Sequence, residues 1–253
     1  MKRGYLLLLV ALFSLKGFAQ QYTGMSGLIH TPSADMDEVG DVRIGTHFLN
    51  RHFLPDVAFD YEGKYSSEDF YCSITPFSWV EIGYTFTLRK GNRGMWTQPG
   101  EEIGYNRKDQ YFSLKLRPLK EKPGKWWPGI AIGTNDPKTN ATKRDEEGNK
   151  VNQHFGNYYI AASKHLDVKH HIIGFHVAYR EWIRTYNSKW DGLVGGVTYQ
   201  PSFQQNLRLI AEYTGEDMNV GFDWKLWKHL LIQASLQDGR HFSGGICFCM
   251  NLL

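Results

Sequence analysis

Charged side chains recur at alternate positions of several segments that are otherwise apolar, and they suggest a surface for an anionic ligand. The ten residues are Arg43, Glu81, Arg89, Lys115, Arg117, Arg180, Arg208, Glu212, Asp223 and Lys225. Seven basic residues cannot pair one to one with three acidic residues, so we expect some positive charge to remain available. The alternative is a structural filling of salt bridges, since barrels of about eight strands are filled by side chains whereas those of about 16–18 strands hold water.

Histidines and cysteines are the residues that could bind a metal ion. His170, His171 and His176 lie close together in sequence. On a strand, however, His171 faces away from the other two, and His170 and His176 are ~20 Å apart. Cys72, Cys247 and Cys249 show no metal-ligand spacing, and we expect three unpaired thiols. We therefore expect no metal site.

We recognise no catalytic motif in this sequence. No segment places a nucleophile or an acid/base pair at a recognisable spacing, so we expect no catalytic residue and no cofactor. The acidic cluster Asp145-Glu146-Glu147 lies in a stretch almost free of apolar residues. It indicates a solvated loop, with cation binding as a minor alternative.

The stretch WVEIGYTFTLR, residues 79–89, shows which element positions the charged side chains. Apolar residues alternate with small, polar or charged ones through the whole stretch. Such alternation is typical of a strand with two different faces. A soluble sheet shows it over about 4–8 residues, whereas a strand tilted across a bilayer needs about 9–11. We therefore predict a membrane strand with Ile82 and Phe86 in lipid and Thr85 in the lumen.

The same alternation recurs downstream and predicts an all-β, antiparallel outer-membrane barrel of about twelve strands. Long connections are expected at 51–66, 90–108, 134–153 and 182–190 on one side, with compact turns on the other. Tryptophans fall at or near predicted strand ends, where interfacial girdles belong. They are Trp79, Trp126, Trp127, Trp182, Trp190 and Trp227.

The chain of 253 residues divides into three predicted parts. Residues 1–19 combine a basic start, an apolar run and a small-residue cleavage site, which predicts a cleaved signal peptide and export to the outer membrane. Residues 20–39 form a lead segment with the motif GLIHTPSADM, and residues 40–253 form the barrel. No later stretch reaches 18 apolar residues, and a net charge of +3 implies no nucleic-acid partner.

Four ordered blocks resemble the YjbH-like exopolysaccharide biosynthesis family of Gram-negative outer-membrane proteins. They are YTGMSGLIHTPSADMDEVGDVRIG, TPFSWVEIGYTF, WWPGIAIGTND and GGVTYQPSFQQNLRLIAEYTGEDMNVGF, and together they span most of the predicted mature chain. The chain looks like a single-barrel member. The motif residues that the resemblance singles out are Gly27, Leu28, Ile29, Pro32, Ser33 and Ala34. They would form an ordered plug or barrel lead, the alternative being a polar lead-in.

The resemblance implies a non-enzymatic barrel for exopolysaccharide or capsule biosynthesis or export. The ten charged residues would then contact an anionic surface polysaccharide, and the other partners would be outer-membrane lipid and further polysaccharide-export proteins. Two alternatives stay open. One is an outer-membrane pore or structural barrel for small solutes, and the other is a barrel enzyme that modifies lipid or surface glycan.

Overall fold

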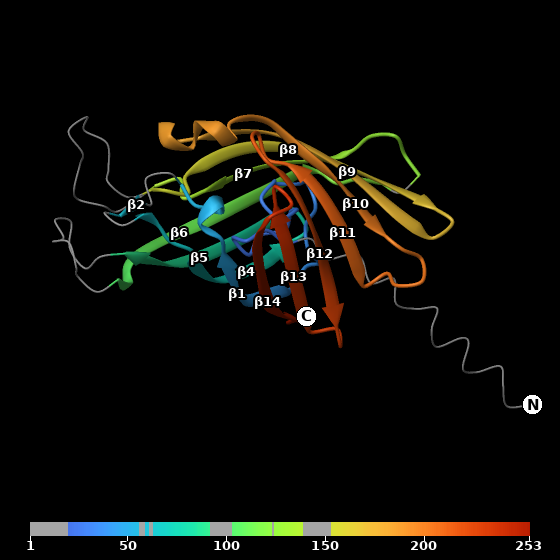
Figure 1. Ribbon diagram of the computed structural model, residues 1–253. Helices are drawn as coiled ribbons and strands as arrows, with labels where there is room; N and C mark the ends of the chain where they lie inside the picture. The colour runs from blue at the N-terminus through green and yellow to red at the C-terminus, as the bar shows by residue number, and fades with distance from the viewer. Residues whose placement is uncertain (1–19, 56–58, 61–62, 92–102, 123, 139–152) are drawn as a thin grey trace, which may run out of the picture.

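Twelve antiparallel strands close into a barrel in the computed structural model, which describes residues 20–55, 59–60, 63–91, 103–122, 124–138 and 153–253 (Figure 1). The barrel strands are β1 (Asp41–Leu49), β4 (Ser67–Phe77), β5 (Val80–Gly91), β6 (Gly104–Leu119), β7 (Gly129–Asn135), β8 (Asn157–Val168), β9 (His171–Trp182), β10 (Gly192–Gln200), β11 (Leu207–Tyr213), β12 (Met218–Leu226), β13 (Leu230–Gln237) and β14 (His241–Asn251). Each pairs with its neighbour, and β1 closes the barrel on β14. The predicted barrel of about twelve strands is confirmed.

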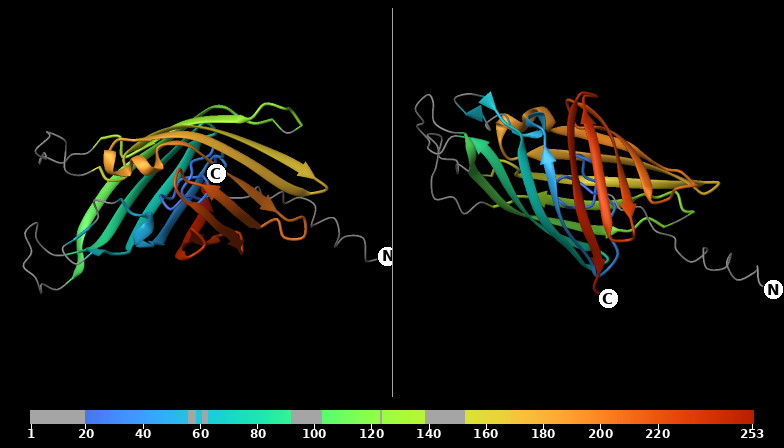
Figure 2. Two further views of the ribbon diagram at one scale, coloured as in Figure 1. Left: turned by 45° about the horizontal axis from the view of Figure 1, so that its top comes forward. Right: turned by 60° about the horizontal axis from the view of Figure 1, so that its bottom comes forward.

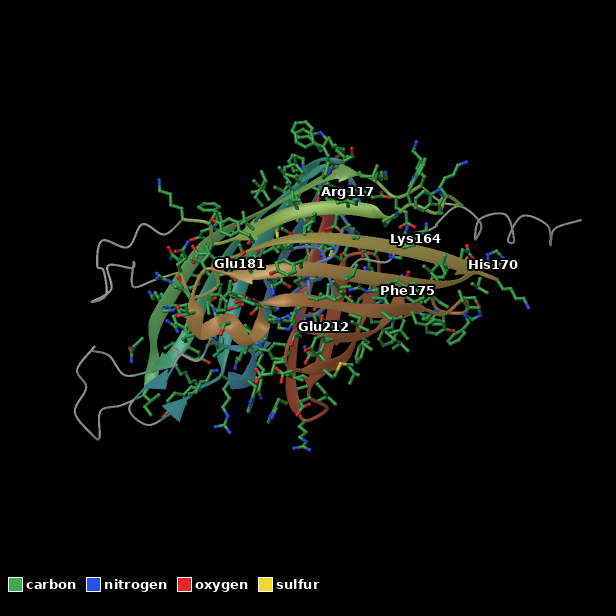
Figure 3. All side chains as sticks on the ribbon, turned by 90° about the horizontal axis from the view of Figure 1, so that it is seen from above. Arg117, Lys164, His170, Phe175, Glu181 and Glu212 are labelled. Atoms are coloured by element: carbon green, nitrogen blue, oxygen red, sulfur yellow. The ribbon has the colours of Figure 1, made fainter. Side chains whose placement is uncertain are left out.

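The connections give the barrel two different ends. At the short-turn end, β4–β5, β8–β9 and β12–β13 are joined by two or three residues. The opposite, long-loop end carries the short helices η1 (Arg51–Phe53) and η3 (Thr185–Trp190) and the small sheet of β2 (Phe59–Asp60) and β3 (Gly63–Lys64). Figure 3 shows His170 and Glu181 at opposite ends of the barrel. The predicted signal peptide and the cluster Asp145-Glu146-Glu147 lie outside the described residues.

Several strands extend further than the alternation predicts. The alternation itself covers 110–117 and 69–75, whereas β6 begins six residues earlier, at Gly104, and β4 runs two residues beyond each end of 69–75. The added part of β6 is polar, so it carries no apolar half to reveal a strand. A strand needs the two-faced pattern only where its faces meet different environments.

The two faces of the sheet are as the alternation predicts. Ile82 and Phe112 are exposed on the outer wall, whereas Glu81, Thr85 and Lys115 are fully buried inside. An apolar outer face and a polar inner face are the arrangement that a barrel in lipid requires. Among the described residues, no helix has the length and apolarity needed to cross a membrane.

The tryptophans divide into two groups. Trp79, Trp126 and Trp227 are exposed next to the compact connections of the short-turn end, and Trp127 lies beside them. Trp182 and Trp190, only 5% and 1% exposed, pack inside the long-loop end. The prediction that these two belong to an interfacial girdle is therefore wrong. A position at a strand end does not by itself decide whether the ring turns outward or inward.

A charge on the outer wall tests the assignment of the lipid face. Phe112 lies in the middle of β6 and is 65% exposed. We expect Phe112→Arg to destabilise folding into lipid vesicles by about 2–4 kcal/mol, because a charge near the bilayer midplane is not solvated. Tyr105→Arg, at the end of the same strand, should cost about 0–1 kcal/mol. Denaturant titrations followed by heat-modifiable gel mobility measure both, and equal losses would contradict the assignment.

Candidate functional site

The lead segment, residues 20–39, lies inside the barrel (Figure 2). Its tip is a tight turn in which Leu28 N donates to Thr31 O at 3.0 Å and Gly27 bridges to Pro32. Glycine is required at position 27, because an added Cβ would lie 2.4 Å from Cγ of Gln21. All six residues singled out in the motif are buried. A segment with little strand pattern thus becomes the filling of the lumen.

Glu212 of β11 holds the tip of the lead segment. Its carboxylate accepts hydrogen bonds from three consecutive backbone N–H groups, those of Ile29 at 3.1 Å, His30 at 2.8 Å and Thr31 at 3.0 Å. Asn219 donates a fourth bond at 2.8 Å. Successive N–H groups in a turn form a concave site for an anion. The buried charge of Glu212 is therefore compensated by the backbone of the lead segment.

A second anchor lies near the short-turn end. Ser26 N donates to Glu81 at 2.6 Å, and Lys115 donates to Ser26 Oγ at 2.7 Å and to the Asp35 carbonyl at 3.0 Å. Lys115 and Glu81 also form an ion pair at 3.3 Å. Since both charged side chains are fully buried, each depends on the other and on the lead segment for its polar contacts.

Arg180 and a group of aromatic rings enclose His30. Arg180 donates to the His30 carbonyl at 2.9 Å and to the Thr214 carbonyl at 3.0 Å. Burial, together with the positive charge of Arg180, lowers the pKa of His30 well below its usual value. The ring is therefore neutral. The rings of Tyr22, Phe53, Trp182 and Trp190 lie within 6.1 Å of the His30 ring, measured between centroids.

Two further arginines hold the segment by its carbonyl and carboxylate groups. Arg208 donates to Gly27 O at 3.1 Å and to Asp223 at 3.0 Å. Arg43 of β1 pairs with Asp37 of the lead segment. A count of the charges on the predicted strands leaves out Asp37 of the lead segment. It also leaves out the backbone carbonyl groups that accept hydrogen bonds from the arginines. The expected surplus of available positive charge is therefore not found at these positions.

The ten charged residues fall into two groups. Seven contact the lead segment or a residue that does: Arg43, Glu81, Lys115, Arg180, Arg208, Glu212 and Asp223. Arg89 lies toward the long-loop end and Lys225 toward the short-turn end, both nearly buried. Arg117 is half-buried and donates to Ser78 O at 2.8 Å. Contact of these ten residues with a polysaccharide stays a prediction.

A separate group of side chains that could hold a metal ion lies toward the short-turn end. Asp35 of the lead segment faces His165 of β8 and His176 of β9, and their ligand atoms lie within 4.8 Å of one another. Burial raises the pKa of Asp35, but the positive charges of His176, His165, Arg208 and Lys115 together outweigh burial and lower that pKa to about 2. In the sequence His176 is considered only with His170 and His171, because Asp35 lies outside any strand pattern.

Removing the charge of Glu212 tests how firmly the lead segment is held. Glu212→Gln places an amide N–H₂ group among backbone donors, so at least one buried donor loses its acceptor. We expect a destabilisation of about 1–3 kcal/mol and faster chymotrypsin cleavage near Tyr22 and Leu28, measured by mass spectrometry. Glu216→Gln is the control, because Glu216 is exposed and pairs with Lys189 at 3.7 Å. Equal cleavage of both variants would show that Glu212 does not hold the segment.

Comparison with known proteins places this barrel in a family. Among solved structures it is similar to the Salmonella typhi outer membrane phospholipase (12% identity over 84% of this chain and 90% of that chain, TM-score 0.38). It is also similar to Wzi from Escherichia coli, described as a carbohydrate-binding β-barrel involved in group 1 capsule assembly (11% identity over 74% of this chain and 52% of that chain, TM-score 0.31). Likenesses at these scores carry no inference about activity. No curated protein matches significantly. Residues 19–253 match the family described as exopolysaccharide biosynthesis protein YbjH, and the chain therefore belongs to the YjbH family.

Proposed function

We propose that this chain is a non-enzymatic outer-membrane barrel that takes part in the biosynthesis or export of a surface polysaccharide. The description of its family supports the polysaccharide role. The apolar outer wall supports insertion into a membrane, and bacterial single-chain barrels of this kind belong to the outer membrane. Export would depend on the signal peptide expected at residues 1–19.

The filled lumen is the observation that favours this role over a small-solute pore. The lead segment occupies the interior, and residues of the long-loop end close over it. Phe53 and Leu54, which follow β1, pack in one buried cluster with Leu28 and Ile29 of the lead segment. A pore for small solutes needs a continuous water-filled channel through the barrel. A role in polymer assembly does not need one.

A catalytic role for this barrel has less support. Among the described residues, Ser163 and His176 form a buried serine–histidine pair, with Ser163 Oγ 2.9 Å from His176 Nδ1. In a serine triad, the acid holds the ring nitrogen opposite the serine. Here Thr198 Oγ1 lies 3.1 Å from the opposite nitrogen, and Asp35 lies on the same side as Ser163. Ser163 and His176 are also buried under the lead segment.

The polysaccharide role is tested in cells that lack this chain. We expect surface polysaccharide to fall on deletion and to return with the wild-type chain or with Glu216→Gln. We expect Glu212→Gln to restore less polymer per folded barrel, because the lead segment is held less firmly. The measurement is polymer at the cell surface, normalised to heat-modifiable protein. Unchanged polymer after deletion would refute the role.

The pore alternative is tested with purified protein in liposomes. We expect the wild-type barrel to admit no mono- or disaccharide, because its lead segment fills the lumen. Glu212→Gln provides the comparison, since a loosened segment should raise solute flux above that of the wild type. Swelling rates in isotonic sugar measure both. Rapid flux through the wild-type barrel would favour the small-solute pore.

A further inference from the structure

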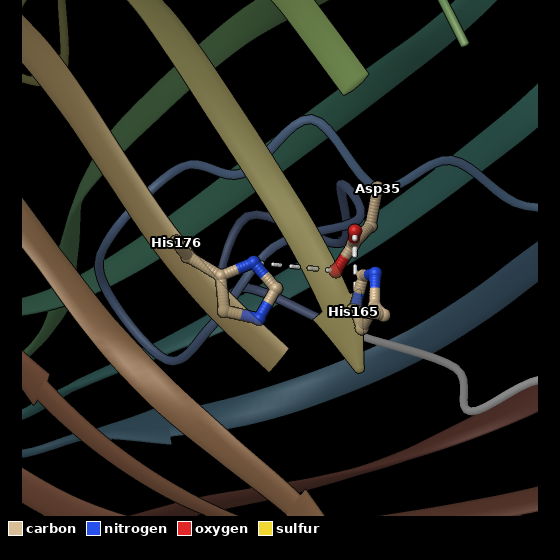
Figure 4. Close-up of side chains that lie close together, drawn as sticks. All are labelled: Asp35, His165 and His176. Atoms are coloured by element: carbon tan, nitrogen blue, oxygen red, sulfur yellow. Dashed lines mark ion pairs between the residues drawn. The ribbon is translucent and has the colours of Figure 1, made fainter. Parts of the chain in front are cut away.

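Asp35, His165 and His176 come from three segments and converge at one point inside the barrel (Figure 4). Asp35 Oδ1 lies 3.7 Å from His165 Nε2, and Asp35 Oδ2 lies 3.7 Å from His176 Nδ1. These separations are too long for hydrogen bonds. Two ring nitrogens and a carboxylate thus surround a point without bonding directly to one another.

The ring nitrogen of His165 farther from Asp35, Nδ1, already has a hydrogen-bond partner. It lies 2.8 Å from Glu121 Oε2, and because a carboxylate only accepts, Nδ1 carries the proton. Glu121 is itself fixed, since it accepts from His165 N at 2.9 Å and pairs with Lys164. In the neutral ring, Nε2 then points its lone pair toward Asp35. Metal-binding histidines typically donate their other N–H to a carboxylate in this way.

In His176, too, the ring nitrogen nearer Asp35 is the one without a proton. Ser163 Oγ accepts from Ala34 N at 2.9 Å, so its own hydrogen is available to His176 Nδ1. His176 Nε2 lies 3.1 Å from Thr198 Oγ1, where it can donate its proton. The lone pair of Nδ1 accepts from the Ser163 hydroxyl, so an ion bound at Nδ1 would take the place of the hydroxyl hydrogen there. His165 thus presents the lone pair of the nitrogen nearer Asp35, and His176 presents its own once the Ser163 hydroxyl hydrogen turns away.

We propose that Asp35, His165 and His176 bind one divalent transition-metal ion. One carboxylate and two imidazoles suit Zn²⁺. Zinc binds histidine nitrogen and carboxylate oxygen at about 2.0–2.2 Å, and three protein ligands with one open position form a known type of site. Tetrahedral geometry at those bond lengths separates neighbouring ligand atoms by about 3.4 Å. The two separations of 3.7 Å involve different oxygens of Asp35, and the three ligand atoms lie within 4.8 Å of one another, so the side chains would close in slightly around the ion.

The ion would fasten the lead segment to the barrel wall. Asp35 belongs to the lead segment, whereas the two histidines belong to the adjacent strands β8 and β9. The side chains of His165 and Asp35 are 32% and 19% exposed, and that of His176 is fully buried. The site is therefore open on the side of His165, near the short-turn end. An ion entering there would complete a link between two parts of the chain far apart in sequence.

Metal titration of the full chain in detergent, after chelator treatment, tests the site. We expect one Zn²⁺ per chain by calorimetry and one Co²⁺ per chain by visible absorption. Asp35→Asn and His165→Gln should abolish this binding. Glu121→Gln, which leaves all three ligands in place, should weaken it about 10- to 100-fold, as loss of an outer carboxylate does at other sites. Heat-modifiable mobility verifies that each variant is folded.

His241→Gln is the matched control for metal binding by histidines elsewhere on the barrel. His52 and His241 stack with ring centroids 3.5 Å apart at the long-loop end and could bind a metal ion adventitiously. We expect His241→Gln to bind Zn²⁺ as the wild type does. Zinc should also slow chymotrypsin cleavage of the lead segment in the wild type and in His241→Gln, but not in His165→Gln. Absence of stoichiometric binding in the wild type, or equal binding by His165→Gln and the wild type, would overturn the proposal.

Discussion

Compensation of buried charge is the constraint on which this barrel depends. Glu81, Lys115 and Glu212 point inward from the wall and are shielded from solvent. An ionised group in such a place is very unfavourable unless it is paired or hydrogen-bonded. The lead segment supplies the missing partners, mainly from its backbone. It is therefore required by the charge pattern of the strands, and the strands in turn fix its conformation.

The arrangement of the partners explains why a short segment can be held so firmly. Glu212 and Arg180 hold the tip near the long-loop end, whereas Glu81 and Lys115 hold Ser26 nearer the short-turn end. Because the anchors lie at two levels of the barrel, the loss of one anchor loosens the segment without releasing it. Its removal would expose several uncompensated charges at once, each costing more than an ordinary hydrogen bond. Displacement of the segment is thus a cooperative event.

The sequence predicts the barrel well because strand alternation is a local signal. Ile82 faces outward and Thr85 inward because side chains alternate along every strand. The partners of the inward charges are not local. Glu212 binds residues that precede it in sequence by about 180 positions, through backbone groups that every residue type possesses. No residue pattern marks such a contact. The inward position of Trp182 and Trp190 is not marked in the sequence either, since both rings pack against His30 of the lead segment.

The grouping of Asp35, His165 and His176 is likewise not marked by any local pattern in the sequence. The alternation over 172–180 places His176 on the inward face, but the strand that the sequence predicts at 156–164 ends before His165. Asp35 has no facing to predict, because the lead segment is irregular. Only the folded barrel brings the three together, and it does so beside the second anchor, where Lys115 binds the Asp35 carbonyl. The backbone of Asp35 thus contacts β6, and its side chain faces β8 and β9 on the other side of β7. A ligand that engages the Asp35 carboxylate would add to the same cooperative set of contacts that retains the lead segment.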